Sequence, residues 1–147
     1  MSPKQMDVAG RFRKLAVKRG LTPGALLDAS PEDFDLLLLA ASCEFTATRT
    51  YTEREVNDLL GHWLQTAGGM LAVDHVELRR WLVDFAVLAR DAYGRAYSRA
   101  ITPARLLKWV AEAVDVDFRH EFADANAQES QKREARKRTW QHAKAGS

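Results

Sequence analysis

The chain has 147 residues, 46% of them hydrophobic and 29% charged, as is ordinary for one soluble globular domain with an appendage. Its longest apolar run, Leu36–Ala41, is far shorter than the roughly 20 residues that cross a bilayer, so we expect no membrane span. The single Cys43 excludes an intramolecular disulfide and agrees with a cytoplasmic location. The net charge of +2 is uneven: residues 130–147 hold six Lys or Arg and one Glu, a balance of +5, which leaves −3 for residues 1–129.

Helical spacing of apolar residues predicts three helices in the first third of the chain. Thr22 and Pro23 begin the short second helix. Ser30 and Pro31, a serine cap followed by proline, begin the third. This third helix is apolar around most of its circumference, so we place it at the centre of the core. The first helix covers residues 4–19 and buries Val8, Phe12, Leu15 and Ala16 on one face.

Two capped amphipathic helices follow, after a short strand predicted at residues 49–51. Thr52 and Glu55 have the spacing of a capping box, and Asp74 with Glu77 repeats it. A flexible break rich in glycine is expected between the two helices. The first helix carries an apolar stripe formed by Val56, Leu59, Leu60, Trp63 and Leu64. The second carries the stripe Leu78, Trp81, Leu82 and Phe85.

A β-hairpin is predicted directly after the second capped helix, with strands at residues 86–91 and 95–99. Its turn places Asp91 first and Gly94 fourth, which suits a type I turn closed by a left-handed glycine. Two helices followed by a hairpin are the element order of a winged helix-turn-helix. The predicted fold is therefore mainly α: a winged helix-turn-helix of three helices plus a β-hairpin wing, with helical extensions at both ends.

The chain divides into four predicted segments. A helical extension at residues 1–29 precedes the winged-helix domain at residues 30–101. A carboxy-terminal helix at residues 102–127 returns to the core, and a basic polar tail at residues 128–147 ends the chain.

The second capped helix carries candidate contacts to a DNA groove. With its apolar stripe buried, its outward arc holds Arg79 and Arg80, and arginine can donate two parallel hydrogen bonds to phosphate or to the edge of guanine. His75 lies near the start of the helix, where base contacts usually fall. The plainer alternative is a solvated face on which Arg80 pairs with Asp84 or Glu77.

Further candidate DNA contacts lie in the hairpin, the preceding helix and the tail. The hairpin offers Arg90, Tyr93 and Arg95, which suit phosphate or the minor groove and equally suit an ordinary solvated hairpin. On the preceding helix, Arg54 and Asn57 are expected to face the DNA backbone. The tail could grip phosphates or serve as a solubilising end, and its basic residues are Lys132, Arg133, Arg136, Lys137 and Arg138.

Two outward valines open a different interpretation. Val76 and Val83 lie among the arginines, where they could touch thymine methyl groups, be covered by the amino-terminal helix, or be covered by a partner subunit. Residues 44–101 hold seven Arg and eight acids, a balance of −1, and this favours a protein interface over a DNA interface.

The sequence shows no catalytic or metal-binding motif. There is no glycine-rich phosphate loop, no G-x-S-x-G, no H-E-x-x-H and no C-x-x-C. The four histidines are too scattered for a zinc site. We therefore expect no enzymatic activity, no metal and no cofactor.

Three stretches resemble the bacterial uncharacterised family DUF2087: Y-T-E-R-E-V-N-D-L-L, D-H-V-E-L-R-R-W-L-V-D-F and L-A-R-D-A-Y-G-R-A-Y-S-R. The resemblance covers about residues 31–99, and it implies a DNA-linked role because the family occurs alone or attached to bacterial transcriptional regulators. The chain departs from the family in its long connection at residues 65–73 and in Ala86, where the family tends to have glycine. The matching motif positions are Tyr51, Glu53, Glu55, Val56, Asn57, Asp74, Leu78, Arg79, Arg80, Arg90, Gly94 and Tyr97.

These observations predict a DNA-binding protein, in which helix 74–85 and hairpin 87–99 contact double-stranded DNA and Tyr93, Arg95 and the tail hold the backbone. We expect a bacterial transcriptional regulator in the cytoplasm, associated with the nucleoid. The alternative is a winged-helix module for protein–protein interaction or dimerisation, without sequence-specific DNA binding. A homodimer would then form through the carboxy-terminal helix or the outward valines.

Overall fold

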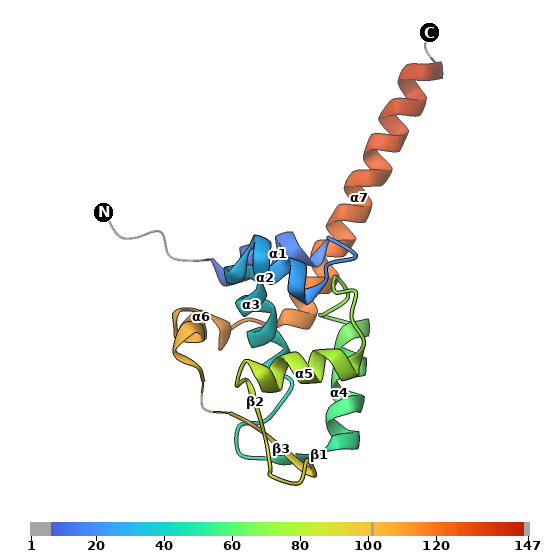
Figure 1. The fold of residues 1–147 in the computed structure, drawn as a ribbon. Helices are drawn as coiled ribbons and strands as arrows, with labels where there is room; N and C mark the ends of the chain where they lie inside the picture. Colours follow the sequence, from blue (N-terminus) through green and yellow to red (C-terminus); the bar gives the residue numbers. More distant parts are fainter. Residues whose placement is uncertain (1–6, 101, 146–147) are drawn as a thin grey trace, which may run out of the picture.

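The computed structural model describes residues 7–100 and 102–145 and is mainly helical (Figure 1). The strands form an antiparallel sheet in the order β1-β3-β2. The mainly α fold with a hairpin is confirmed, and this arrangement is compatible with a winged helix-turn-helix. In chain order, the described residues form α1 (Val8–Ala16), α2 (Pro23–Ala29), α3 (Pro31–Ser42), β1 (Thr50–Thr52), α4 (Glu53–Gln65), α5 (His75–Asp84), β2 (Leu88–Arg90), β3 (Ala96–Arg99), the 3-10 turn η1 (Ala104–Leu106), α6 (Leu107–Ala113) and α7 (Phe118–Ala145).

Helix α3 lies at the centre of the core, as predicted. All of its residues from Phe34 to Ser42 are buried. Helices α1, α2 and α6 pack against it. The rings of Trp81 on α5 and of Phe85, directly after α5, meet the ring of Phe34 edge-on, with centroids 5.5 and 4.9 Å from that of Phe34. A helix covered on this many sides needs apolar residues around its circumference, which the sequence supplies.

Side-chain caps fix the starts of α4 and α5. The Thr52 hydroxyl accepts a hydrogen bond from the N–H of Glu55 at 3.1 Å, and the Glu55 carboxylate accepts one from the N–H of Thr52 at 3.0 Å. The bond from the Thr52 N–H lowers the pKa of the Glu55 carboxyl below its usual range. Asp74 accepts the N–H of Glu77 at 2.8 Å. The capping box of α4 is therefore confirmed, whereas α5 has the predicted Asp74 cap without the reciprocal bond to Glu77.

Ser30 occupies the cap position of α3, but its side chain makes no capping hydrogen bond. The expected serine cap is therefore wrong in its chemistry, although the helix begins at the expected residue. Pro31 accounts for that start, because its fixed φ suits the first helical position and its missing N–H needs no cap.

The connection between α4 and α5 is a packed turn. Ala67, Gly68 and Met70 are buried, and a Cβ added to Gly68 would lie 2.4 Å from the ring of Trp63. The backbone N–H of Gly68 also donates to the Trp63 carbonyl at 2.8 Å. The prediction of a flexible break here is wrong, because the glycine lets the chain fold back onto the tryptophan ring.

The carboxy-terminal region differs from the predicted helix and tail. Helix α6 ends at Ala113, the chain turns, and α7 then runs unbroken from Phe118 to Ala145. Asp117 begins α7 by accepting the N–H of His120 at 3.1 Å. The predicted boundary between residues 127 and 128 therefore falls inside one helix, and the described part of the basic tail is helical.

Ala86 joins α5 to β2 in a left-handed conformation, with φ of 59°. The left-handed region costs an L-residue about 1–2 kcal/mol, and glycine avoids that cost. Glycine loses more chain entropy on folding, by about 0.4–1 kcal/mol. We therefore expect Ala86→Gly to raise the free energy of unfolding in urea by about 0.5 kcal/mol. Ala89→Gly, inside β2, is the control and should lower it; destabilisation by both variants would contradict the prediction.

Candidate nucleic-acid interface

A pocket of about 320 Å³ lies between the outward arc of α5 and the hairpin. Arg90 of β2 and Tyr97 of β3 are register partners across the two strands, so the hairpin forms one wall of the pocket. Three arginines against one aspartate make the pocket positively charged, as a site for an anionic group requires. The lining residues are Val76, Arg79, Arg80, Val83, Asp84, Arg90 and Tyr97.

Arg79 is held inside the protein by residues from two other elements. Its guanidinium donates a hydrogen bond to the side-chain oxygen of Asn57 and pairs with Glu53 at 3.2 Å, both on α4. It also lies over the ring of Tyr97, 5.9 Å from the centroid. Arg79 and Asn57, both predicted as DNA contacts, thus bind each other. Arg79 fixes α5 against α4 and β3, and its donors are largely committed to that role.

Arg80 and Arg90 have free guanidinium groups. Both side chains are exposed at the pocket, and neither forms a hydrogen bond or ion pair with any other side chain in the described part of the chain. The alternative in which Arg80 pairs with Asp84 or Glu77 is therefore not what the structure shows. Each guanidinium retains five donors for a group outside the protein.

The hairpin turn presents Tyr93 and Arg95 to solvent. Tyr93 is 83% exposed, and the side chain of Arg95 has no ion pair within the described residues. The Asp91 carboxylate accepts the N–H of Arg95 at 2.8 Å and of Tyr93 at 3.2 Å, which lowers the pKa of the Asp91 carboxyl. Gly94 closes the turn with φ of 68°, as predicted. The turn is thus held rigid while its tip is left accessible.

The remaining predicted contacts near the hairpin differ in accessibility. Arg54 on α4 is exposed, whereas His75 at the start of α5 is half-buried. Val76 is 40% exposed and Val83 is half-buried, and both line the pocket. The amino-terminal helix therefore does not cover Val76.

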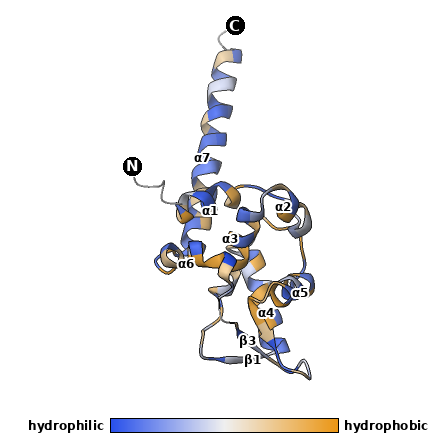
Figure 2. Cartoon of the chain, turned by 60° about the vertical axis from the view of Figure 1, so that its left-hand side comes forward, coloured by the Kyte–Doolittle hydropathy of each residue, from blue (hydrophilic) through white to orange (hydrophobic). Residues whose placement is uncertain are grey.

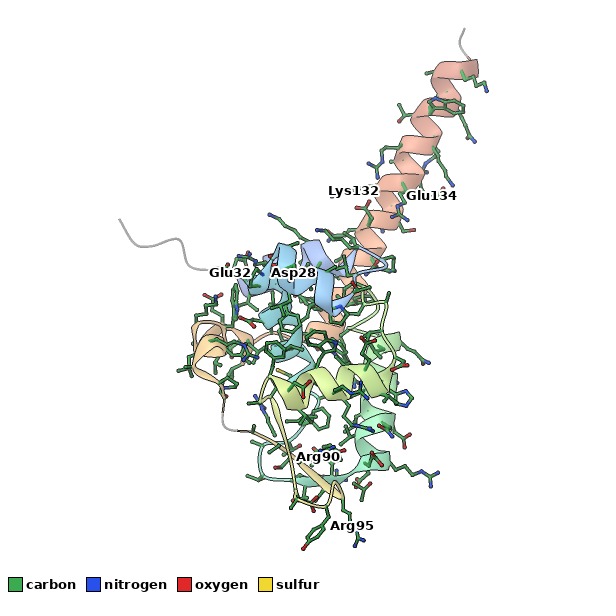
Figure 3. The ribbon with its side chains drawn as sticks, in the orientation of Figure 1. Asp28, Glu32, Arg90, Arg95, Lys132 and Glu134 are labelled. Atoms are coloured by element: carbon green, nitrogen blue, oxygen red, sulfur yellow. The ribbon has the colours of Figure 1, made fainter. Side chains whose placement is uncertain are left out.

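The basic residues of the tail lie at the other end of the molecule. Figure 3 shows Lys132 on α7 on one side of the protein body and Arg90 and Arg95 on the opposite side. The described tail residues from Lys132 to Lys144 are all exposed. The body of the protein therefore separates the tail from the hairpin, and contact of both with the DNA backbone stays a prediction.

Glu53 and Tyr97 were not among the sequence-predicted site residues, although both are motif positions of the family resemblance. Their shared role is to hold Arg79 together with Asn57. The motifs on α4, α5 and β3 thus meet around one guanidinium group. Charge and helical spacing could not reveal this, since the three segments are distant in sequence.

Residues 7–100 and 102–145 contain no group of three or more His, Cys, Asp or Glu arranged to hold a metal ion. None of the helices found in those residues is both long enough and apolar enough to traverse a bilayer.

The fold and site define a mainly helical domain with a three-stranded antiparallel sheet and a positively charged pocket between a helix and a hairpin. Residues 29–99 match the family DUF2087, described as an uncharacterized protein conserved in bacteria. This match confirms the resemblance seen in the sequence motifs. No curated protein and no solved structure was found to match the chain.

Proposed function

We propose that the chain is a DNA-binding protein of bacterial regulatory type that contacts duplex DNA with α5 and the hairpin. One observation carries the proposal: Arg80 and Arg90 line a pocket between these elements, and their guanidinium groups have no ion-pair partner in the described residues. Exposed arginines without intramolecular partners keep their donors available for phosphate oxygens and guanine edges.

The placement of the other side chains supports a division of roles. Arg79 anchors α5 to α4, which fixes the orientation of the helix before any ligand arrives. Arg80 faces the groove between helix and hairpin, and Arg95 at the turn extends the positive surface toward the hairpin tip (Figure 3). Arg54, exposed on α4, would contact the backbone beside this surface.

One observation favours a second function, a module for binding protein or for forming a homodimer. Val76 is 40% exposed at the same pocket, and residues 44–101 have a net charge of −1. A partner protein could bury the exposed valines and form ion pairs with the arginines at the same interface. Light scattering with and without duplex DNA separates the two functions, because a stable dimer indifferent to DNA supports the second.

The test of DNA binding is the full chain carrying Arg80→Ala with Arg90→Ala. We expect the double variant to lose about 10- to 100-fold in affinity for a random duplex at 0.1 M salt. The steepness of log K against log salt should also fall by about 2, because each phosphate contact contributes about 0.9 to it. Gel shifts or fluorescence anisotropy over a salt series would measure both. Arg79 is left unchanged, because its removal would also release α5 from α4.

The matched control is Lys18→Ala with Lys108→Ala, which removes two exposed positive charges, one just after α1 and one on α6. This control should bind within about threefold of the natural sequence, since the charges lie away from the pocket. Equal losses in both double variants would mean that only net charge matters, and that the pocket is not the contact surface.

A further inference from the structure

Helix α7 has an anchored half and a projecting half. In the anchored half, Arg13 of α1 pairs with Glu121 at 2.8 Å and with Asp124 at 2.9 Å. Phe12 and Phe118 meet edge to face with centroids 4.8 Å apart, and Ala125 is 6% exposed. From residue 130 onward, every described side chain is exposed and the helix extends away from the body (Figures 1 and 2).

The projecting half carries a dense positive charge. Residues 130–145 hold six Lys or Arg against one Glu, a balance of +5 over 16 residues, or about 24 Å of helix. At 3.6 residues per turn, five of the six basic residues fall within an arc of about 140° together with one aromatic ring. We call this face the α7 stripe; it consists of Lys132, Arg133, Arg136, Lys137, Trp140 and Lys144.

Few contacts within the protein occupy the stripe. Arg133 and Arg136 lie 3.8 and 3.4 Å from Glu129, with side chains 66% and 69% exposed. Exposed pairs of this kind contribute about 0–1 kcal/mol, so a phosphate group can displace them. Trp140 is 64% exposed, with the Lys144 ammonium 4.7 Å from its ring centroid. The stripe therefore offers several cations and one aromatic face to a partner.

A second copy of the chain does not fit the stripe. The buried Phe118 and Ala125 and the half-buried Phe122 follow a repeat of alternating steps of four and three residues. The next positions of that repeat are Glu129, Lys132 and Arg136. A coiled coil needs apolar residues at these positions, and two strongly positive helices would repel each other. The projecting half thus lacks a seam for self-association.

A membrane surface also fits poorly. Membrane-surface helices bury an apolar face rich in Leu, Phe or Trp, and between residues 130 and 145 the only large apolar side chain is that of Trp140. Most of the projecting helix is hydrophilic in Figure 2. Duplex nucleic acid, with one negative charge per roughly 1.7 Å of its axis, matches a row of cations about 20 Å long, from Lys132 to Lys144, that lacks an apolar face.

We propose that the α7 stripe binds the phosphate backbone of a second nucleic-acid segment, so that one chain bridges two duplexes. The inference rests in part on the proposed function, because the α5–hairpin surface holds the first duplex. The α7 stripe and the α5–hairpin surface lie at opposite ends of the molecule (Figure 3). The body of the protein lies between the two surfaces, so each surface can hold a duplex of its own.

The experiment captures a fluorescent 20-base-pair duplex on beads that carry a second duplex, using the full chain at 0.1 M salt. The natural sequence should retain the fluorescent duplex in proportion to the protein bound. The variant Lys132→Gln with Lys137→Gln should lose about tenfold or more of this capture and still bind the bead duplex through α5 and the hairpin. Glutamine favours helix, so circular dichroism should show α7 unchanged.

The matched control, Arg138→Gln with Lys108→Gln, removes the same charge from the other side of α7 and from α6 and should bridge normally. A dimer that bridges through two α5–hairpin surfaces would capture equally well with the stripe variant, which would overturn the proposal. Tight binding to phosphatidylserine vesicles without duplex binding by the stripe would also overturn it.

The two proposals fail separately. Suppose that Arg80→Ala with Arg90→Ala still binds one duplex as tightly as the natural sequence, while the stripe variant binds that duplex more weakly. The stripe is then the main nucleic-acid surface, and the proposed function of α5 is wrong. If the stripe variant loses nothing and the arginine variant loses binding, the bridging proposal alone is wrong.

Discussion

A fragment limited to residues 29–99 is expected to be unfolded or aggregated, although it contains the whole region matched by the family. Helix α3 is buried by α1 and α6 as well as by the elements inside this region. Phe12, Leu15, Leu106 and Trp109, which lie outside residues 29–99, are at most 2% exposed. Each such side chain contributes about 1.5–3 kcal/mol by burial, and whole domains are stable by only about 5–15 kcal/mol.

Circular dichroism and proton NMR of the fragment would test this expectation. The control is residues 7–129, which keeps α1, α6 and the anchored half of α7 and should unfold cooperatively. A dispersed NMR spectrum from residues 29–99 alone would show that the covering helices are dispensable for folding. If the fragment does not fold, as expected, the flanking helices belong to the folding unit of this chain.

Arg105→Ala is expected to destabilise the protein by about 2 kcal/mol, below the range for a fully buried ion pair, because the Arg105 side chain is 35% exposed while its partner Asp35 is buried. The Arg105 guanidinium pairs with the Asp35 carboxylate at 2.9 Å, donates to the Phe85 carbonyl at 3.1 Å, and lies 4.7 Å from the centroid of the Phe85 ring. Asp35 is only 7% exposed. Removing its partner would leave a carboxylate buried within the central helix without compensation.

Urea denaturation followed by tryptophan fluorescence would measure the loss. Adding Asp35→Asn to Arg105→Ala should recover part of it, because a neutral amide costs less to bury than a carboxylate. Arg49→Ala breaks the exposed pair with Glu55 and should cost less than about 1 kcal/mol. A loss from Arg105→Ala no larger than that from Arg49→Ala would show that Asp35 finds another way to be solvated.

The contacts of Arg105 and Arg79 show how the chain positions its candidate interface. Arg105 attaches the segment after the hairpin to α3 and to the end of α5, while Arg79 attaches the middle of α5 to α4. Both arginines are committed within the protein. Among the arginines that line the pocket, Arg80 and Arg90 are therefore the two left available, and the proposed DNA binding would depend on them rather than on Arg79.

Much of the fold could be predicted because its determinants are local. The capping box at Thr52 and Glu55, the cap at Asp74 and the turn closed by Gly94 each depend on residues within a few positions of one another. The central position of α3 followed from the apolar residues on all sides of this helix, which occur in one continuous stretch of the sequence. The motifs likewise sufficed to recognise the family.

The candidate site was only partly predictable from the sequence. Helical spacing placed Arg79 and Arg80 together on the outward arc, but it could not tell which one is bound within the protein. That difference depends on Asn57 and Glu53 of α4 and on Tyr97 of β3, which approach α5 only when the chain folds. The distribution of charge along the chain also revealed a basic tail, but not that the tail lies on the opposite side of the protein from the hairpin.

The sequence by itself determined the central position of α3, the starts of α4 and α5, the hairpin turn and the family match, since these depend on neighbouring residues and on periodicity. Only the tertiary structure decided that Arg80 and Arg90 are unpaired at one pocket and that Lys132 lies at the opposite end of the molecule. The physical reason is that ion pairing and the relative positions of surfaces depend on distances across the fold. Those distances are set by how the buried faces of α1, α3 and α7 pack, not by any one stretch of residues.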